Sequence, residues 1–260
     1  MKFDFPLDLS PASVDEREQF YREEFPGKQL EEKMERWDVF VPVVDVGSES
    51  TLYRPRFKEY KDKLVRMTDY GDMDDLKDRI VEFAPEDLYY VTTVEKEDRI
   101  ETNPEQELVF DLDPEMVECE RCERKKKYLE GAAREYVFCE ECFKQVARET
   151  RQLYSFLQNH FSDLRLVYSG RGFHIHVEDE SAFAMDREDR RELAGKAAKE
   201  FPIDRKITAG EKDLIRMPGS LHGLVSRVVT EVEVSDLNRP LQILESRAVP
   251  RFVKEDVGTG

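Results

Sequence analysis

The sequence predicts an α+β domain in which helices flank a central antiparallel or mixed sheet, with a small cysteine-rich knob projecting from it. Three observations indicate this class. Short β-forming runs alternate with amphipathic helical stretches along the 260 residues. One β-forming run carries two carboxylates that point to the same face. Four cysteines follow in two close pairs, a spacing typical of a compact metal-bound segment.

The composition is that of a folded and strongly acidic protein. Hydrophobic residues make up 39% of the chain, charged residues make up 38%, and the net charge is −17. No apolar run approaches the roughly 20 residues that cross a membrane. Met1–Pro6 lacks the apolar stretch of a signal peptide, so we expect a cytoplasmic protein without membrane contact. The acidity argues against a protein that simply coats nucleic acid, but it allows an enzyme with a local basic groove.

The N-terminal half is predicted to begin with two helical segments that Pro26-Gly27 separates. Short strands and further helices follow. The predicted strands are Val39–Val44, Leu52–Phe57 and Tyr89–Val94, with a turn at Gly47–Ser50 between the first two. The predicted helices cover residues 13–37, 58–65 and 72–83.

The C-terminal half has the same mixture of elements. An amphipathic helix is predicted over Phe143–Phe161, and Asp186 is the N-cap of a helix that ends near Phe201. The predicted strands and extended pieces are Leu164–Tyr168, Phe173–Val177, 203–208, 213–217 and 225–234. No strong pattern follows Arg239, and Val257–Gly260 is expected to be a frayed tail.

The two carboxylates lie in Glu107–Pro114, which reads Glu-Leu-Val-Phe-Asp-Leu-Asp-Pro. Because side chains alternate along a strand, Asp111 and Asp113 share one face, and the apolar residues take the other. Two neighbouring carboxylates repel each other unless a cation or a proton lies between them. Oxygen ligands of this kind suit Mg²⁺ or Mn²⁺. The alternative is a strand that ends in a solvated acidic turn, and this motif alone does not decide between them.

The cysteines form two Cys-x2-Cys pairs with sixteen residues between the pairs. This spacing predicts a closed, structural zinc site rather than a disulfide framework or a catalytic metal. The four predicted ligands are Cys119, Cys122, Cys139 and Cys142. Lys125–Lys127 lie between the pairs and, with the nearby Arg121 and Arg124, make the densest basic cluster of the chain. This cluster either contacts phosphates or balances the charge of the thiolates.

Leu166–Val177 is predicted to be a strand, a glycine-rich turn at Ser169–Gly172, and a second strand. The glycines allow backbone N–H groups to converge on an anion, and Arg171 adds a fork of donors suited to phosphate. His174 and His176 share one face of the second strand. The alternative is an ordinary hairpin with exposed histidines.

Two further polar segments follow downstream. Asp204 lies in an extended context within Pro202–Thr208, and Leu214–Gly223 brings Arg216 and His222 into one loop. Taken alone, such an aspartate is more often a surface residue, and such a histidine is more often a loop residue with satisfied hydrogen bonds.

In their order along the chain, these motifs resemble the catalytic small subunit of archaeal and eukaryotic DNA primases. The resemblance covers about residues 16–234 and is strongest from 107 to 223. Its motifs are Asp-x-Asp on a strand, the cysteine pairs, Ser-Gly-Arg-Gly-x-His, an isolated Ile-Asp, and Arg-x-Pro-x-Ser-x-His-Gly. It implies the primase small-subunit fold, with a catalytic domain over 1–240, a zinc-binding insertion over 115–143 and a C-terminal tail over 241–260.

The resemblance also implies an activity and a role for each matching residue. The expected activity is template-directed synthesis of short primers from nucleoside triphosphates on a DNA template, by two-metal nucleotidyl transfer. The catalytic, metal-binding carboxylates would be Asp111, Asp113 and Asp204. The nucleotide-binding residues would be Ser169, Arg171, His174, Arg216 and His222. Arg36-Trp37 resembles a family segment near the edge of the active site.

A partner is implied as well. The family works as a heterodimer with a large subunit that carries an iron–sulfur cluster, and this chain has no cysteine beyond the four zinc candidates. Three departures are visible. The turn has one arginine where the family usually has two, all four zinc candidates are cysteines, and only 27 residues lie between His176 and Asp204, where the family often inserts a helical subdomain. We therefore expect a compact version of the enzyme.

Other functions remain open from the sequence. One is a stand-alone primase-polymerase for repair or a mobile element that prefers deoxynucleotides, since Asp-Leu-Asp-Pro also resembles the polymerase domain of some bacterial DNA ligases. Another is a zinc-stabilised binding module without catalysis, against which the three intact acids count. A metal-dependent Asp-x-Asp glycosyltransferase is a remote alternative, because it needs neither the Ser169 turn nor His222.

Overall fold

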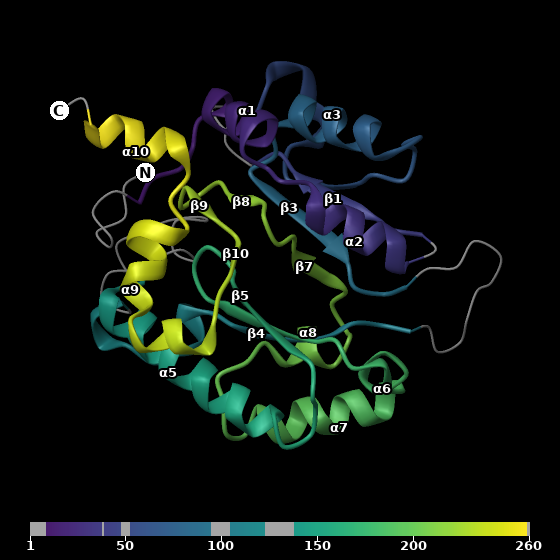
Figure 1. The fold of residues 1–260 in the computed structure, drawn as a ribbon, viewed down its shortest axis with the longest axis vertical. Coiled ribbons are helices and arrows are strands. Elements are labelled where there is room, and N and C mark those ends of the chain that lie inside the picture. The colour runs from purple at the N-terminus through teal and green to yellow at the C-terminus, as the bar shows by residue number, and fades with distance from the viewer. Residues whose placement is uncertain (1–8, 38, 48–52, 95–104, 123–137, 259–260) are drawn as a thin grey trace.

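The strands divide into two antiparallel sheets, which take the place of the single central sheet that the sequence predicts. We describe them from a computed structural model, which covers residues 9–37, 39–47, 53–94, 105–122 and 138–258. The α+β class and the antiparallel pairing are as predicted. Figure 1 shows α1, α2 and α3 on one side of the molecule, α5 and α7 on the other, and the strands between them.

The six-stranded sheet has the order β2-β1-β3-β8-β9, and β7 also pairs with β3. Its strands are β1 (Pro42–Asp45), β2 (Leu64–Arg66), β3 (Asp87–Val91), β7 (Leu214–Arg216), β8 (Leu221–His222) and β9 (Arg227–Val228). The register pairs Tyr89 with Arg216 and Asp87 with His222. Two short strands from later in the chain, β7 and β8, therefore lie beside β3. Their residues Arg216 and His222 lie opposite Tyr89 and Asp87 of β3.

The four-stranded sheet has the order β10-β5-β6-β4. Its strands are β4 (Leu108–Leu112), β5 (Leu164–Tyr168), β6 (Phe173–Val177) and β10 (Thr230–Glu231). The bounds of β5 and β6 agree with the sequence prediction residue for residue. In the register, Asp111 of β4 lies opposite His174 of β6.

The helices begin where the sequence supplies caps. Ser13 and Glu16 form a capping box at α1, Asp72 caps α3, and Asp186 caps α7 as predicted. The longer helices are α1 (Val14–Glu23), α2 (Lys28–Arg36), α3 (Met73–Phe83), α5 (Glu140–Leu157), α7 (Arg187–Ala197) and α10 (Arg251–Gly258). The short helical pieces are η1 (Pro55–Tyr60), η2 (Pro114–Met116), α6 (Glu180–Phe183), α8 (Arg205–Thr208), η4 (Val234–Asn238), α9 (Pro240–Gln242) and η5 (Ile243–Arg247).

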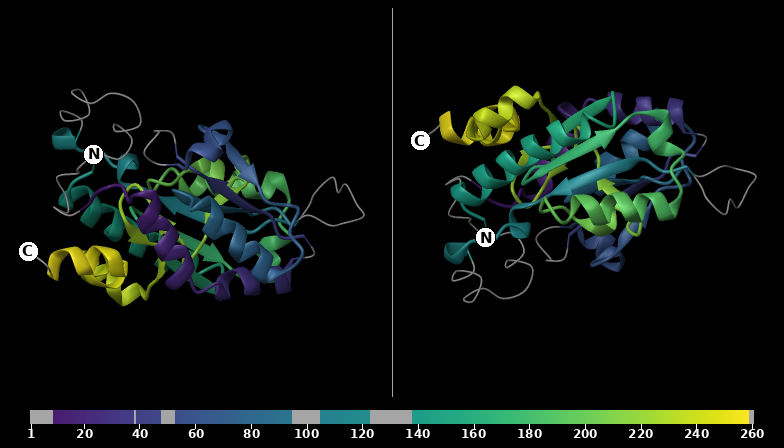
Figure 2. Two further views of the ribbon diagram at one scale, coloured as in Figure 1. Left: turned by 90° about the horizontal axis from the view of Figure 1, so that it is seen from above. Right: turned by 90° about the horizontal axis from the view of Figure 1, so that it is seen from below.

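Two main hydrophobic clusters hold the layers together. One joins the four-stranded sheet to α5, and its stacked pair Phe143 and Phe173 has ring centroids 5.7 Å apart. The view from below in Figure 2 shows α5 and α7 lying over this sheet. The other cluster joins α1 and α3 to the six-stranded sheet, and it also contains Val109 from β4. The face of β4 opposite α5 is thus turned toward the six-stranded sheet, and Asp111 lies on that face.

Several predicted elements are wrong. Residues 53–57 of the predicted strand Leu52–Phe57 do not form a strand, because Pro55 starts the 3-10 helix η1 and Phe57 stacks on Phe83. The predicted helix over 58–65 ends in strand β2, which is the partner of β1. The predicted turn at Gly47–Ser50 and the start of the strand at Leu52 lie outside the described residues, apart from Gly47.

The C-terminal third also departs from the predictions. The extended piece over 203–208 is helix α8, since the Asp204 side chain accepts the backbone N–H of Lys206. The valine-rich strand over 225–234 is split, with β9 in one sheet and β10 in the other. After Arg239 the chain forms α9, η5 and α10, and Ile243 and Leu244 are buried in the cluster beneath the four-stranded sheet. Across the described ranges, no helix combines the length and the apolar character that crossing a bilayer needs.

Candidate functional site

Asp111 and Asp113 stand at the end of β4, where the strand passes into η2. Phe110 and Leu112 are buried on the opposite face, in the cluster with α5, so the apolar half of the strand fixes the direction of the acidic half. Each of the two aspartate side chains is 16% exposed. They therefore lie at the rim of the core, where a ligand can reach them.

His174 faces Asp111 across the sheet. Its Nε2 lies 3.4 Å from Asp111 Oδ1, and its side chain is buried. Burial, with the neighbouring His176 adding to it, lowers the pKa of His174 well below its usual value. At neutral pH the ring is therefore uncharged and can offer one N–H as a hydrogen-bond donor.

The turn between β5 and β6 packs closely on the residues around it. The Gly172 N–H donates to Ser169 Oγ at 3.0 Å, and the Ser169 N–H donates to the Gly172 carbonyl oxygen at 3.0 Å. A Cβ at position 172 would lie 2.1 Å from the Leu112 carbonyl oxygen and 2.3 Å from Asp113 Oδ1. Glycine is thus required here because the turn lies directly on the chain that carries Asp113.

Arg171 projects from this turn toward two carboxylates. Its Nη2 lies 2.6 Å from Asp113 Oδ2 and 2.7 Å from Glu115 Oε1. The arginine predicted to contact phosphate is therefore held by acidic side chains in this structure. Its single guanidinium neutralises part of the negative charge that β4 and η2 bring together.

Asp204 reaches the site by a different route. Its backbone N–H donates to the carbonyl oxygen of Asp111 at 2.9 Å, so α8 begins beside β4. Its Oδ2 accepts a hydrogen bond from Lys212 Nζ at 2.8 Å. The third predicted carboxylate is thus adjacent to the first, although it comes from a helix N-cap instead of the sheet.

The electrostatics of this acidic cluster (Asp111, Asp113, Glu115 and Asp204) are unbalanced. Burial, and then the charges of Asp113, Asp204 and Glu115, raise the pKa of Asp111 well above its usual value. Burial alone would also raise the pKa of Asp113, but Arg171 above all, with Arg216, holds it below its usual range. Burial and the Asp113 charge raise the pKa of Glu115. The cluster carries more negative charge than its neighbours compensate.

The chemistry of this cluster suits a divalent cation. Asp111 Oδ1 is buried without a hydrogen bond. The atoms of the cluster that could bind a metal are all carboxylate oxygens, which hard cations prefer. Asp111, Asp113 and Asp204 are the candidates to hold it. A cation there would replace repulsion between the carboxylates with attraction.

Arg216 and His222 approach from the six-stranded sheet. Arg216 lies on β7 and His222 on β8, and both lie next to Asp87 of β3. His222 packs on the glycine turn, because a Cβ at Gly170 would lie 2.5 Å from His222 Cβ. The five predicted nucleotide-binding residues come from both sheets, with Ser169, Arg171 and His174 in or beside the four-stranded sheet and Arg216 and His222 in the six-stranded sheet.

His176 belongs to a second, separate cluster. Its Nδ1 lies 2.9 Å from Glu107 Oε1, while Lys33 Nζ and Tyr90 Oη donate to Glu107 Oε2 at 2.8 and 2.7 Å. We call these four residues the Glu107 cluster. Trp37, which the sequence places near the active-site edge, lies beside it, with Lys33 Nζ 4.8 Å from its ring centroid. The ring of Trp37 is buried in the core, and the side chain of Arg36 lies outside the described residues.

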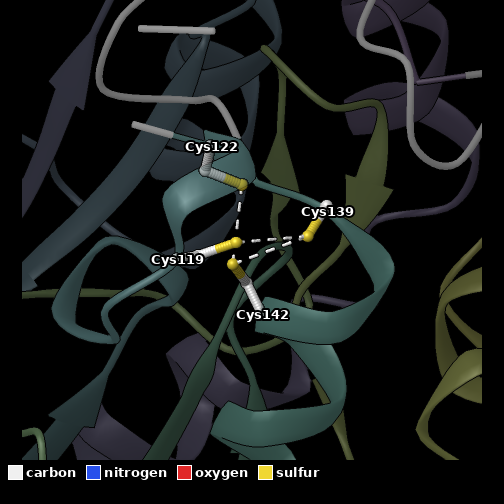
Figure 3. A group of neighbouring side chains, drawn as sticks. All are labelled: Cys119, Cys122, Cys139 and Cys142. Carbon is white, nitrogen blue, oxygen red and sulfur yellow. Dashed lines mark hydrogen bonds between the residues drawn. The ribbon is translucent and has the colours of Figure 1, made fainter. Parts of the chain in front are cut away.

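The four cysteines converge on one point, as Figure 3 shows. The Sγ–Sγ distances are 3.8 Å for Cys119 and Cys139, 3.5 Å for Cys122 and Cys142, and 3.7 Å for Cys139 and Cys142. Zinc–sulfur bonds of about 2.3 Å in a tetrahedron put sulfurs about 3.8 Å apart, whereas a disulfide needs about 2.05 Å. The cluster can therefore hold one zinc-sized ion. Of the basic cluster between the pairs, Arg124 and Lys125–Lys127 lie outside the described residues.

Three acidic residues that contact the predicted site residues or histidines were not predicted. Glu115 follows Asp113 by two residues, so its position in sequence was a usable signal. Glu107 precedes a predicted apolar strand, and its burial depends on Lys33, which comes from a distant helix. Asp87 opens β3, but only the sheet topology brings Arg216 and His222 to it.

Known proteins resemble this chain in sequence. A family model for the DNA primase small subunit matches residues 110–202. An uncharacterized DNA primase small subunit-like protein of Archaeoglobus fulgidus is 36% identical over 272 residues, covering 97% of this chain and 95% of that protein. The DNA primase small subunit PriS of Pyrobaculum calidifontis is 26% identical and covers 74% of each chain.

A solved structure has the same fold. The polymerase domain of Mycobacterium tuberculosis Ligase D, in complex with DNA, matches with a TM-score of 0.52 and 15% identity, covering 95% of this chain and 89% of that one. The strong identity to the Archaeoglobus protein extends over nearly the whole length of both chains. The chain belongs to the DNA primase small subunit family, and it is a nucleotidyltransferase by that membership.

Proposed function

We propose that this chain is the catalytic subunit of a DNA primase that synthesises short primers from nucleoside triphosphates on a DNA template during replication. The observation that carries the proposal is the meeting of three carboxylates with a glycine turn and a histidine. Asp111 lies opposite His174 and accepts the N–H of Asp204 through its backbone carbonyl, while Asp113 adjoins the turn that carries Arg171. Nucleotidyl transfer needs this combination of cation ligands and anion donors.

The carboxylates Asp111, Asp113 and Asp204 would hold Mg²⁺ or Mn²⁺. When bound there, such ions would supply a lower pKa for an attacking 3′-hydroxyl and positive charge for the phosphates. The protein's own contribution is position. Strand β4 fixes Asp111, and the backbone hydrogen bond from Asp204 fixes the start of α8 beside it.

The donors around the acidic cluster would bind the triphosphate. They are Ser169, Arg171, His174, Arg216 and His222. Arg171 is bound to Asp113 and Glu115 in the structure. We propose that cation binding by Asp113 weakens this contact, so that Arg171 turns to the phosphates while Glu115 continues to hold part of its guanidinium. His174, uncharged because burial lowers its pKa, would donate a hydrogen bond.

The four-cysteine cluster is proposed to bind structural Zn²⁺. Four thiolates close the coordination sphere, so no position is left for a substrate. Cys142 lies in the first turn of α5, next to Phe143, which stacks on Phe173 of β6. The ion would thereby anchor the start of the helix that supports the site.

We also propose that a large subunit works with this chain. The names of the Pyrobaculum relatives describe a small subunit, which supports a partner. The four cysteines are all placed in one cluster, and the sequence has no other cysteine for an iron–sulfur cluster. The partner would have to supply the cysteines that bind an iron–sulfur cluster.

A template-directed assay tests the function. The purified chain is given labelled ribo- or deoxynucleoside triphosphates with Mg²⁺ or Mn²⁺, on an unprimed and on a primed DNA template. We expect products complementary to the template on both, and dependence on the divalent cation. Extension of the primed template alone, with deoxynucleotides preferred, would assign a primase-polymerase instead. No incorporation on the primed template would refute nucleotidyl transfer.

A further inference from the structure

Asp87 is a buried acid that joins two of the proposed phosphate-binding residues. Its side chain is 3% exposed, and Oδ1 lies 3.0 Å from Arg216 Nε and 3.1 Å from His222 Nδ1. One carboxylate oxygen thus serves a guanidinium and an imidazole at the same time. The strand register accounts for this arrangement. Strand β3 pairs with both β7 and β8, which brings Arg216 and His222 to the start of β3.

Tyr89 completes this arrangement. Its hydroxyl donates to Asp87 Oδ2 at 3.2 Å and accepts from Arg216 Nη2 at 3.2 Å, and the guanidinium carbon lies 5.1 Å from its ring centroid. Two nitrogens of the Arg216 guanidinium are therefore engaged, which fixes its plane. Although burial would raise the pKa of Asp87, Arg216 and His222 hold it far below its usual value, so the carboxylate stays ionised.

His222 connects this arrangement to the four-stranded sheet through its contact with Gly170. Gly170 has φ +100°, and a Cβ built on it would lie 2.5 Å from His222 Cβ and 2.9 Å from His222 Cδ2. The imidazole therefore packs on the backbone of the turn that carries Ser169 and Arg171. Asp87, His222 and the turn form a continuous path from the six-stranded sheet to the four-stranded sheet.

We propose that Asp87 is a positioning residue for the nucleotide's triphosphate. Asp87 would not touch the substrate, because its oxygens are taken by Arg216, His222 and Tyr89. It holds Arg216 and His222 in place before the substrate arrives, so that binding does not have to order them. This inference rests on the proposed function, because the proposed function identifies the triphosphate as the anion that Arg216 and His222 bind.

The proposal predicts a specific kinetic effect. In Asp87→Asn, Arg216 loses its charge partner and His222 loses the carboxylate beside its Nδ1, so the substrate must order both side chains. We expect the KM for the nucleoside triphosphate to rise roughly tenfold or more, with kcat changed by less than about threefold. Inhibition by inorganic tripolyphosphate, which has only the phosphate part of the ligand, should weaken by a similar factor. A purely structural role would instead reduce the active fraction, and with it kcat.

Two further variants keep the test decisive. Tyr89→Phe removes the hydroxyl that contacts Asp87 and Arg216, and it should raise KM by about threefold. Asp45→Asn is the matched control. Asp45 lies directly opposite Asp87 on β1, but its Oδ1 accepts the backbone N–H of Gly47. We expect its KM and its tripolyphosphate inhibition to equal those of the wild type.

The experiment measures primer extension against nucleotide concentration for the full-length wild type and the three variants, with thermal unfolding of each. An active wild type with unchanged KM in Asp87→Asn would overturn the inference and leave the proposed function standing. If Asp87→Asn does not fold, Tyr89→Phe decides, and a KM equal to that of Asp45→Asn would overturn the inference. An inactive wild type would instead refute the proposed function.

Discussion

The Glu107 cluster and the acidic cluster are built on the same face of β4 and β6, yet their charges are arranged in opposite ways. Glu107 and Asp111 are four residues apart, so both point to that face, and His176 and His174 accompany them from β6. Glu107 and His176 are fully buried, whereas Asp111 is 16% exposed. The two clusters allow a direct comparison of how a carboxylate and a histidine are used.

The Glu107 cluster is compensated. Burial would raise the pKa of Glu107, but Lys33 and His176 hold it well below its usual value. Both of its oxygens accept hydrogen bonds or face a ring nitrogen. A buried carboxylate with partners on every side joins α2, β3, β4 and β6, which is a structural role.

The acidic cluster is undercompensated. Asp111 has a raised pKa and a buried oxygen without a hydrogen bond, and three other carboxylates surround it. A fold retains such an arrangement only if something else offsets the repulsion. The comparison supports the proposal that the acidic cluster holds a cation, whereas the Glu107 cluster supports the fold.

The largest effect is expected from removing the acids. Asp111→Ala combined with Asp113→Ala should lower primer synthesis by at least about a thousandfold, because the cation ligands are lost. The measurement is the primer assay, with zinc content and thermal unfolding as controls for the cysteine cluster and the fold. Unchanged synthesis in the double variant would show that the active site lies elsewhere.

Glu107→Gln should affect stability instead. It leaves Lys33 buried without a counter-charge, so urea unfolding at pH 7 should show a loss of about 3–5 kcal/mol. Extension by the folded enzyme should stay within roughly threefold of the wild type, since the contact of the two clusters is between the rings of His176 and His174, and both rings remain in the variant. A large loss of kcat with no loss of stability would show that the Glu107 cluster belongs to the active site.

The same variant has a predictable pH dependence. The folded-state pKa of Glu107 lies below its usual value, so its stabilisation is present above the unfolded pKa of about 4.5 and is lost as the pH falls through the lower folded value. The difference in unfolding free energy between wild type and Glu107→Gln should therefore shrink in strongly acidic solution. If the difference in unfolding free energy grew on acidification, the pKa of Glu107 would be raised in the folded state, contrary to this interpretation.

A smaller effect of opposite sign is expected at Asp111. Without divalent cation, Asp111→Asn removes a repelled charge, and the protein should gain roughly 1 kcal/mol in urea unfolding at neutral pH. His174→Gln on the same face serves as a control that leaves the carboxylates in place. Destabilisation by Asp111→Asn would mean that the carboxylate is already compensated by protein groups.

The sequence predicted what depends on local patterns. The bounds of β5 and β6 follow from alternation around a glycine turn, and the start of α7 follows from its cap Asp186. The convergence of the cysteines follows from two tight Cys-x2-Cys turns. These features depend on residues close together in the chain.

The failures come from contacts between distant segments. Phe57 stacks on Phe83, and this long-range packing favours η1 over the predicted strand. The run 225–234 alternates like one strand, but its halves pair in different sheets, which no local pattern shows. In the site, Asp87 meets Arg216 after 128 intervening residues. The predicted motifs could be read from the sequence, but the distant residues that contact them, such as Asp87, could not.

The central claim is that the acidic cluster, and not the Glu107 cluster, binds the divalent cation. Thermal unfolding of the zinc-loaded protein with increasing Mn²⁺ tests it most directly, on wild type, Asp111→Asn and Glu107→Gln. A ligand that binds only the folded state raises the Tm with concentration. We predict a saturable rise for wild type and for Glu107→Gln, from a lower starting Tm in the latter, and no rise for Asp111→Asn. An equal rise in wild type and Asp111→Asn would contradict the claim.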